Sequence, residues 1–219
     1  MNRILAATKL DFYTLKTSVR TVAIAFVVPI ILSIVEKAST FAPALVLLLA
    51  TFVGSTVFQI YEKNHAEELF GTLPLRKSEM IAGRYLYALL VALIAFVFAL
   101  IMAVVTTRIS GAALDWFSLW ASVSIGFLYY CFAVGVAYPL YIKFTFSKVY
   151  IFTMLPMYLL GVLGFTLMRT SNIMQNINSV VTFFQKNQLL LPVCGLLGGI
   201  VLLVISALIA NAVFTRREQ

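Results

Sequence analysis

The chain has 219 residues, of which 62% are hydrophobic and only 11% are charged, and its mean hydropathy is +1.02. A soluble domain of this size carries about 25% charged residues, so the composition excludes a soluble enzyme or a soluble binding domain. The net charge of +8 comes from basic residues scattered over several short segments, with no basic stripe and no nucleic-acid motif. The composition therefore predicts one membrane domain over residues 1–219, surrounded by the lipid bilayer and without a nucleic-acid partner.

Residues 1–20 are predicted to form an amphipathic helix. Apolar residues recur at helical spacing, while Lys9, Lys16 and Arg20 gather on the opposite face. The apolar positions are Ile4, Leu5, Phe12, Leu15 and Val19. Such a helix lies in the membrane interface with its basic side chains toward the lipid headgroups. It either anchors the chain only or also contacts a cytoplasmic partner.

Six apolar runs follow, and none of them contains Asp, Glu, Lys or Arg. They cover residues 21–35, 41 to about 61, 85–107, 118 to about 141, about 149–168 and 189–214. A helix that crosses the hydrocarbon core needs about 20 mostly apolar residues, so the runs predict an all-α integral membrane protein with six transmembrane helices. The first run has only about 15 residues and contains Pro29. It either crosses with Arg20 reaching back to the interface or forms half of a re-entrant hairpin with the second run.

The distribution of basic residues predicts the orientation of the chain. With the N-terminus inside, 12 of the 16 Lys and Arg residues face the cytoplasm, which satisfies the positive-inside rule. The four on the outer side are Lys37, Arg108, Arg169 and Lys186. Both termini are therefore expected in the cytoplasm. Residues 169–188 then form a long outer loop with apolar residues at helical spacing, which either caps the bundle or gates an exit.

The most polar part of the chain is the cytoplasmic loop 62–84, between the second and third runs. It also contains apolar residues that belong to no span, namely Leu69, Phe70, Leu73 and Leu75. Apolar residues exposed in a charged loop indicate a docking surface, and the alternative is an ordinary solvated loop. We expect a short helix over about 64–70, a break at Pro74, and a second helix that starts near Ser78 and continues into the third span.

Glycines at helical spacing predict close helix contacts. Gly195 and Gly199 form a G-x-x-x-G pair in the last run, and Gly161 and Gly164 lie three residues apart in the fifth. Small residues at this spacing let two helix backbones approach closely. The contacts are either within the chain or at a dimer seam.

The sequence predicts no catalytic residue, no metal site and no cofactor in this chain. His65 is the only histidine, which excludes an H-E-x-x-H zinc site, and neither a P-loop nor a G-x-S-x-G motif occurs. Ion-driven carriers keep ionisable residues at membrane depth, and the six runs contain none. If the protein moves a cargo uphill, a partner that contacts a cytoplasmic loop must supply the energy.

The cytoplasmic loop and its flanks carry a family resemblance. The segments that carry it are Phe58-Gln59-Ile60-Tyr61-Glu62-Lys63-Asn64, Leu73-Pro74-Leu75-Arg76-Lys77 and Gly83-Arg84-Tyr85. They resemble the permease subunits of type-2 ATP-binding-cassette (ABC) exporters, in the small bacterial branch where permease and ATPase are separate chains. The resemblance implies a half-transporter in the bacterial cytoplasmic membrane: two permeases, identical or paralogous, bound to two cytoplasmic ATPase subunits that hold ATP and Mg²⁺.

In that family the loop after the second span carries a coupling helix that sits in a groove of the ATPase. The resemblance implies that the docking residues here are Glu62, Lys63, Asn64, Glu67, Glu68, Leu69, Phe70, Leu73, Pro74 and Arg76. His65-Ala66 departs from the family pattern, which is often more charged there. The charge-free spans favour a hydrophobic or amphipathic cargo, such as a peptide, an antibiotic or a lipid-like molecule. The alternative is a non-transporting membrane protein, either an assembly or sensory factor or an intramembrane enzyme of unrecognised type.

Overall fold

Long apolar runs fold as α-helices in the computed structural model of the chain, because a helix satisfies its backbone groups internally. The structure describes residues 3–35, 42–64, 76–110, 115–153, 155, 182, 184, 186–187 and 190–215. Within these ranges the helices are α1 (Arg3–Lys16), α2 (Val19–Val35), α3 (Ala42–Lys63), α5 (Lys77–Ser110), α6 (Trp116–Lys143) and α9 (Leu190–Thr215). A further helical segment covers residues 146–153. No strand occurs in these ranges, so the described part agrees with the predicted all-α class.

Four helices in the described residues are long and apolar enough to cross a membrane. They are Pro43–Lys63, Ser78–Ile109, Trp116–Lys143 and Leu190–Val213, and they correspond to the second, third, fourth and sixth predicted runs. The first run lies in α2, which contains Pro29 and has a shorter apolar stretch, Val22–Leu32. Most of the fifth run lies outside the described residues. The structure thus supports four predicted spans, and the count of six stays a prediction.

The N-terminal helix ends earlier than its periodicity predicts. α1 ends at Lys16, and a tight turn follows in which the Thr17 amide donates to the Thr14 carbonyl at 3.1 Å. The Thr17 hydroxyl donates to the same carbonyl at 2.6 Å. Side-chain hydroxyls that bond to nearby carbonyls compete with helix continuation. The predicted helix over 1–20 is therefore wrong at its C-terminal end, because Val19 and Arg20 belong to α2.

α1 packs against α5 and α3, and a glycine makes the close approach to α5 possible. A Cβ atom added to Gly83 would lie 2.6 Å from the Cβ of Ala7. The Thr8 hydroxyl donates to the Gly83 carbonyl at 3.0 Å. Of the predicted apolar face of α1, Phe12 packs against the core while Leu5 is exposed. Only part of the predicted apolar face of α1 therefore contacts the bundle.

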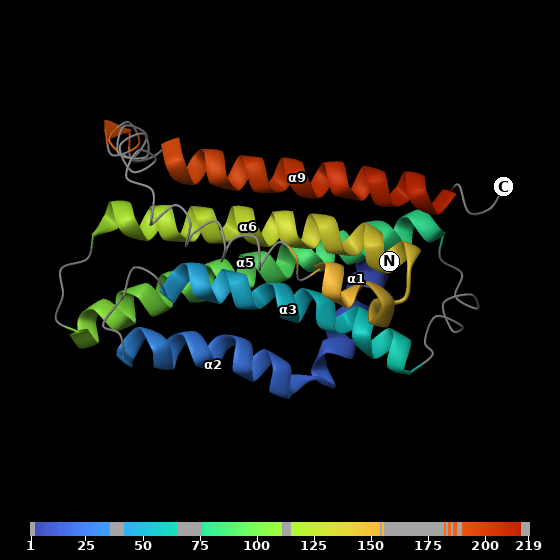
Figure 1. Ribbon diagram of the computed structural model, residues 1–219, viewed down its shortest axis with the longest axis horizontal. Helices are drawn as coiled ribbons and strands as arrows, with labels where there is room; N and C mark the ends of the chain where they lie inside the picture. Colours follow the sequence, from blue (N-terminus) through green and yellow to red (C-terminus); the bar gives the residue numbers. More distant parts are fainter. Residues whose placement is uncertain are drawn as a thin grey trace.

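The centre of the bundle is formed by α3, α5 and α6, with α2 against α3 and α9 along α6 (Figure 1). Buried tyrosines cross-link these helices through backbone carbonyls. Tyr87 donates to Val53 at 3.3 Å, Tyr130 donates to Ala88 at 2.9 Å, and Tyr138 donates to Gly54 at 3.1 Å. A tyrosine buried in an apolar interior needs such a partner for its hydroxyl, so these bonds fix how the three helices align.

The glycine pair of the last run lies where α9 contacts α6. A Cβ atom on Gly195 would lie 2.8 Å from the Cβ of Ser124, and one on Gly199 would lie 2.9 Å from the Sγ of Cys131. The structure therefore places both glycines in a helix contact within one chain. The other predicted glycines, at positions 161 and 164, lie outside the described residues.

Several helix ends lie together at one end of the bundle (Figure 1). They are the start of α1, the end of α3, the start of α5, the end of α6 and the end of α9. We call it the α3–α5 end. α5 starts at Lys77, close to the predicted start at Ser78. At the opposite end Asp115 caps α6, and its side chain accepts a hydrogen bond from the Phe117 amide at 3.1 Å.

Candidate functional site

The α3–α5 end holds the described flanks of the predicted docking loop. Glu62 and Lys63 end α3, Asn64 follows it in a turn, and Arg76 precedes α5. The remaining predicted docking residues lie outside the described residues; they are Glu67, Glu68, Leu69, Phe70, Leu73 and Pro74. ATPase docking by this loop accordingly stays a prediction, and the structure contributes the geometry of the two flanks.

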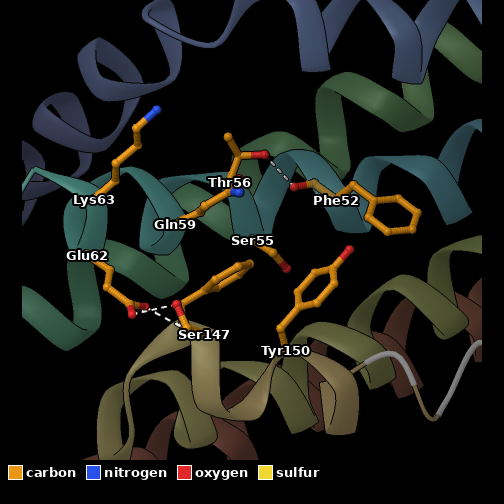
Figure 2. Close-up of a pocket in the computed structure, with 9 residues that line it drawn as sticks. Phe52, Ser55, Thr56, Gln59, Glu62, Lys63, Ser147 and Tyr150 are labelled. Carbon is orange, nitrogen blue, oxygen red and sulfur yellow. Dashed lines mark hydrogen bonds between the residues drawn. The ribbon is translucent and has the colours of Figure 1, made fainter.

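An open cavity of about 710 Å³ lies between α3 and the helical segment 146–153 (Figure 2). We call it the α3 groove. Its lining residues are Phe52, Ser55, Thr56, Gln59, Glu62, Lys63, Phe146, Ser147 and Tyr150. The groove extends along α3 up to the turn that precedes the docking loop.

The walls of the α3 groove are aromatic and hydroxylic. The Ser55 hydroxyl donates to the Thr51 carbonyl at 3.0 Å, and the Thr56 hydroxyl donates to the Phe52 carbonyl at 2.7 Å. These hydroxyl protons are therefore used within α3, and their oxygens remain as acceptors. The formal charges in the lining belong to Glu62 and Lys63, at the α3–α5 end.

Glu62 joins the two walls of the groove. One carboxylate oxygen accepts from the Ser147 amide at 2.9 Å, and the other accepts from the Ser147 hydroxyl at 2.6 Å (Figure 2). The amides of a first helical turn have no partner within the helix. Glu62 thus caps the segment 146–153 from a helix that lies 85 residues away in sequence. Hydrogen bonds to a charged group contribute about 1.5–3 kcal/mol, and water competes for exposed ones.

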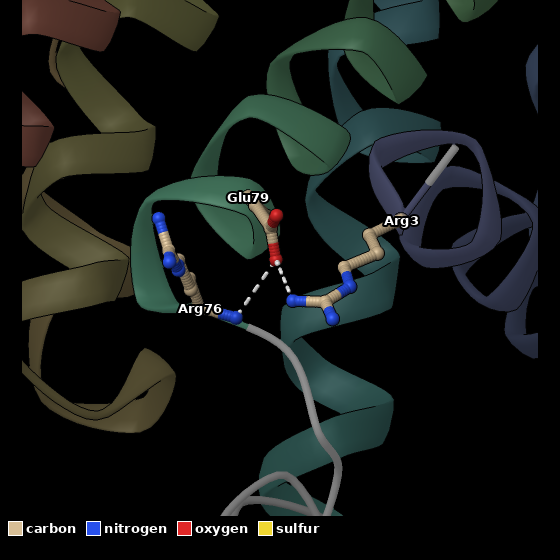
Figure 3. A network of polar contacts seen from close by, with 3 residues as sticks. All are labelled: Arg3, Arg76 and Glu79. Atoms are coloured by element: carbon tan, nitrogen blue, oxygen red, sulfur yellow. Dashed lines mark hydrogen bonds and ion pairs between the residues drawn. The ribbon is translucent and has the colours of Figure 1, made fainter. Parts of the chain in front are cut away.

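A second carboxylate holds the other flank of the loop (Figure 3). Glu79 accepts a hydrogen bond from the Arg76 amide at 2.9 Å and forms an ion pair with Arg3 at 3.8 Å. The contact to Arg76 is one half of a capping box at the start of α5. Because the Arg3 side chain is 58% exposed, the ion pair adds little stability. It does place the start of α1 beside the start of α5.

A buried polar cluster joins α1, α3 and α5. The Tyr61 hydroxyl donates to one carboxylate oxygen of Asp11 at 2.5 Å, and the Thr14 hydroxyl donates to Tyr61 at 3.3 Å. The Arg84 guanidinium lies 4.7 Å from the ring centre of Phe58 and 5.4 Å from that of Tyr61. Asp11 is 3% exposed and Arg84 8% exposed. We call these five residues the junction cluster.

Burial shifts the protonation of Asp11. Removal from water raises the pKa of this carboxyl from 3.8 to about 6, while the charge of Arg84 and the hydrogen bond from Tyr61 partly oppose the rise. The second carboxylate oxygen of Asp11 is buried without a hydrogen-bond partner. An ionised carboxylate is therefore costly here, and the cluster binds a proton more readily than a surface aspartate.

Sequence reasoning missed the junction cluster. It placed Arg84 among the cytoplasmic basic residues and gave Asp11 no role. One signal was present, because Asp11 is the only acidic residue in the first 35 positions, inside a segment otherwise read as basic and apolar. The partners in α3 and α5 lie 50 and more residues away in sequence, so periodicity within α1 could not reveal them.

The described residues include no group of three or more His, Cys, Asp or Glu side chains that could hold a metal ion. The two cysteines, Cys131 and Cys194, are free thiols. The hydrogen-bonded carboxylates Glu62 and Glu79 and the lining of the α3 groove do not combine a nucleophile with an adjacent general base.

Comparison with known protein families shows which family the chain belongs to. A family model described as "ABC-2 family transporter protein" matches residues 8–215. Comparisons with curated proteins and with solved structures find no match. The match covers α1 from residue 8 onward, the four membrane-length helices and the residues between α3 and α5. The chain therefore belongs to the ABC-2 family of transporter proteins and is a type-2 ABC transporter permease located in a membrane.

Proposed function

We propose that this chain is the permease subunit of an ATP-driven exporter in the bacterial cytoplasmic membrane. It pairs with a second permease, either another copy or a paralogue, and binds two cytoplasmic ABC ATPase subunits that hydrolyse ATP with Mg²⁺. The family match over residues 8–215 carries this proposal. The sequence itself contains no P-loop, so ATP hydrolysis by that device belongs to the partner.

The α3–α5 end supports ATPase docking at the loop between these helices. Lys63, Arg76 and Lys143 lie at helix ends that meet there, and the positive-inside rule assigns a basic end to the cytoplasm. In this arrangement both termini are cytoplasmic. The docking loop leaves α3 beside the α3 groove and enters α5 beside α1, so an ATPase that moved the loop would act on both.

The α3 groove supports a role as one wall of the translocation path. Its aromatic rings offer apolar contact and its hydroxyl oxygens and Gln59 offer hydrogen bonds, which together suit a hydrophobic or amphipathic cargo. A volume of about 710 Å³ accommodates a drug-sized molecule or a few side chains of a peptide. The second permease would supply the facing wall.

The test is copurification of the tagged chain with a separately encoded ABC ATPase subunit of the same organism, when both are expressed together. We expect the pair to hydrolyse ATP and the chain alone to show no hydrolysis. Replacing both Leu69 and Phe70 by aspartate is expected to reduce the retained ATPase at least about tenfold, because about 1.4 kcal/mol of lost binding energy suffices for that factor. The variant should still insert into the membrane.

The matched control changes Val180 and Val181 to aspartate. These residues form an apolar pair in the predicted outer loop 169–188, so the control should keep full ATPase binding. Equal binding by wild-type chain and by the Leu69/Phe70 variant would contradict docking at this loop. If the wild-type chain retains no ATPase at all, the exporter assignment itself is wrong.

A further inference from the structure

The bidentate contact between Glu62 and Ser147 has a role beyond helix capping. Both residues line the α3 groove, one from each wall, and both oxygens of Glu62 are occupied by the same serine. The contact therefore sets the separation of the walls at the α3–α5 end of the groove. In the described residues, the two hydrogen bonds of this contact are the polar contacts that join the start of segment 146–153 to the last turn of α3.

Another face of the same turn of α3, next to the face that carries Glu62, is held by buried contacts. Tyr61, adjacent to Glu62, is 5% exposed and donates to Asp11 in α1. Arg84 of α5 lies over the ring of Tyr61. Ser147, in contrast, is exposed to solvent. When the Glu62 contact opens, the start of segment 146–153 loses its hydrogen bonds to α3, while buried Val149 and the hydrogen bond between Tyr141 and Thr153 at 2.6 Å keep the rest of the segment on the bundle. The end of α3 stays against α1 and α5.

The contact is also of a kind that can open and close. It is made at the surface, where water replaces either hydrogen bond, and a binding partner can shift such an equilibrium by its differential affinity for the two states. Glu62 lies only three residues before position 65, where the predicted docking loop continues. A partner on that loop therefore acts within one helical turn of the contact.

We propose that Glu62 is a positioning residue whose contact with Ser147 is a latch: closed, it holds the α3 groove narrow at the α3–α5 end, and open, it lets the start of segment 146–153 move away from α3. The meaning of the latch for transport rests on the proposed function. The latch itself is a property of the single chain and is testable without an ATPase or a cargo.

The experiment measures the distance between the two walls in the full-length chain reconstituted in lipid nanodiscs. Spin labels are placed at Gln59 on α3 and at Ile151 on the segment 146–153, both of which are exposed. The native cysteines Cys131 and Cys194 are first replaced by alanine. Pulsed electron resonance then gives the distance distribution for the wild-type latch and for each variant.

Glu62→Ala is expected to shift the distribution to longer distances and to broaden it. Glu62→Gln should give an intermediate distribution, because one acceptor oxygen is replaced by an NH2 group and the remaining acceptor is uncharged. Ser147→Pro removes both donors yet is tolerated in a first helical turn, so it should reproduce the Glu62→Ala distribution. The double variant Glu62→Ala/Ser147→Pro should add nothing further, since both changes break one interaction.

The matched control is Lys63→Gln, which changes a neighbouring charged residue of the same groove and should leave the distribution unchanged. A wild-type distribution in Glu62→Ala overturns the latch, and so does a shift of equal size in Lys63→Gln. If the wild-type chain binds no ATPase, the exporter assignment is wrong, but the distance measurement still tests the latch.

Discussion

Replacing Gly195 by valine is expected to destabilise the packing of α9 on α6 by about 2–3 kcal/mol, or to prevent it. A Cβ atom at this position would lie 2.8 Å from the Cβ and 3.2 Å from the carbonyl oxygen of Ser124. Neither atom can turn aside, because one is the Cβ atom and the other is a backbone oxygen. The Ser124 hydroxyl is also held by its hydrogen bond to the Trp120 carbonyl at 2.6 Å. The two helices must then separate, and overpacking of this kind typically costs 1–3 kcal/mol.

The measurement is the thermal unfolding of the purified chain, followed by size-exclusion chromatography after heating. Gly198→Val is the matched control, since it lies on the same helix and a Cβ there would have only an ordinary contact, 3.5 Å from a methyl carbon of Leu128. The cost of a β-branched residue in the helix is common to both variants. Equal losses at Gly195 and Gly198 would contradict close packing of α9 on α6.

Asp11→Asn is expected to remove a pH dependence of stability between about pH 4 and pH 6. The folded chain raises the pKa of Asp11 from 3.8 to about 6, so in this window the folded state binds more protons than the unfolded state. The stability due to protonated Asp11 is fully present below about pH 4 and is lost as the pH rises through 6. A rise of about two pKa units corresponds to about 3 kcal/mol.

We therefore compare the unfolding temperature of the wild-type chain with that of Asp11→Asn at the same pH. The difference, wild type minus variant, should be larger near pH 4.5 than near pH 7. The charged and polar groups that interact with Asp11 are Arg84 and Tyr87 from α5, Tyr61 from α3 and Tyr138 from α6. None of them is a carboxyl or an imidazole, the groups whose ordinary pKa lies near this window. The slope is thus assigned to Asp11 itself.

Asp115→Asn provides a control of opposite sign. Hydrogen bonds, chiefly from the Ser118 hydroxyl, lower the pKa of this exposed carboxyl, so its contribution is lost as the pH falls. Its replacement should leave the wild-type slope between pH 4 and pH 6 in place. A wild-type slope that survives in Asp11→Asn would show that the junction cluster does not carry it.

The junction cluster and the Glu62–Ser147 contact divide the end of α3 into a fixed side and a movable side. Asp11 and Tyr61 hold this end on α1 and α5 through a buried contact, where breaking a polar pair is costly. Glu62 meets Ser147 at the surface. The predicted docking loop starts beside both contacts, so we expect a push on that loop to move the groove wall and not the whole bundle.

The helical class, the start of α5 near Ser78 and four of the spans could be predicted from the sequence. Hydrophobic runs about as long as the membrane is thick leave the backbone few alternatives. The boundary at Lys16 could not be predicted, because the helical period of apolar residues continues across it. The break depends on local hydrogen bonds of Thr17 that compete with the helix.

The helical membrane class, the positions of the apolar runs and the loop that resembles a docking segment can all be read from the amino-acid sequence, because these properties depend on composition and on neighbours along the chain. The folded structure is needed to see that Glu62 caps a helix 85 residues away, that Asp11 is buried beside Tyr61 and Arg84, and that Gly195 faces Ser124. Each of these contacts joins segments distant in sequence, and their partners depend on how the helices pack around one another.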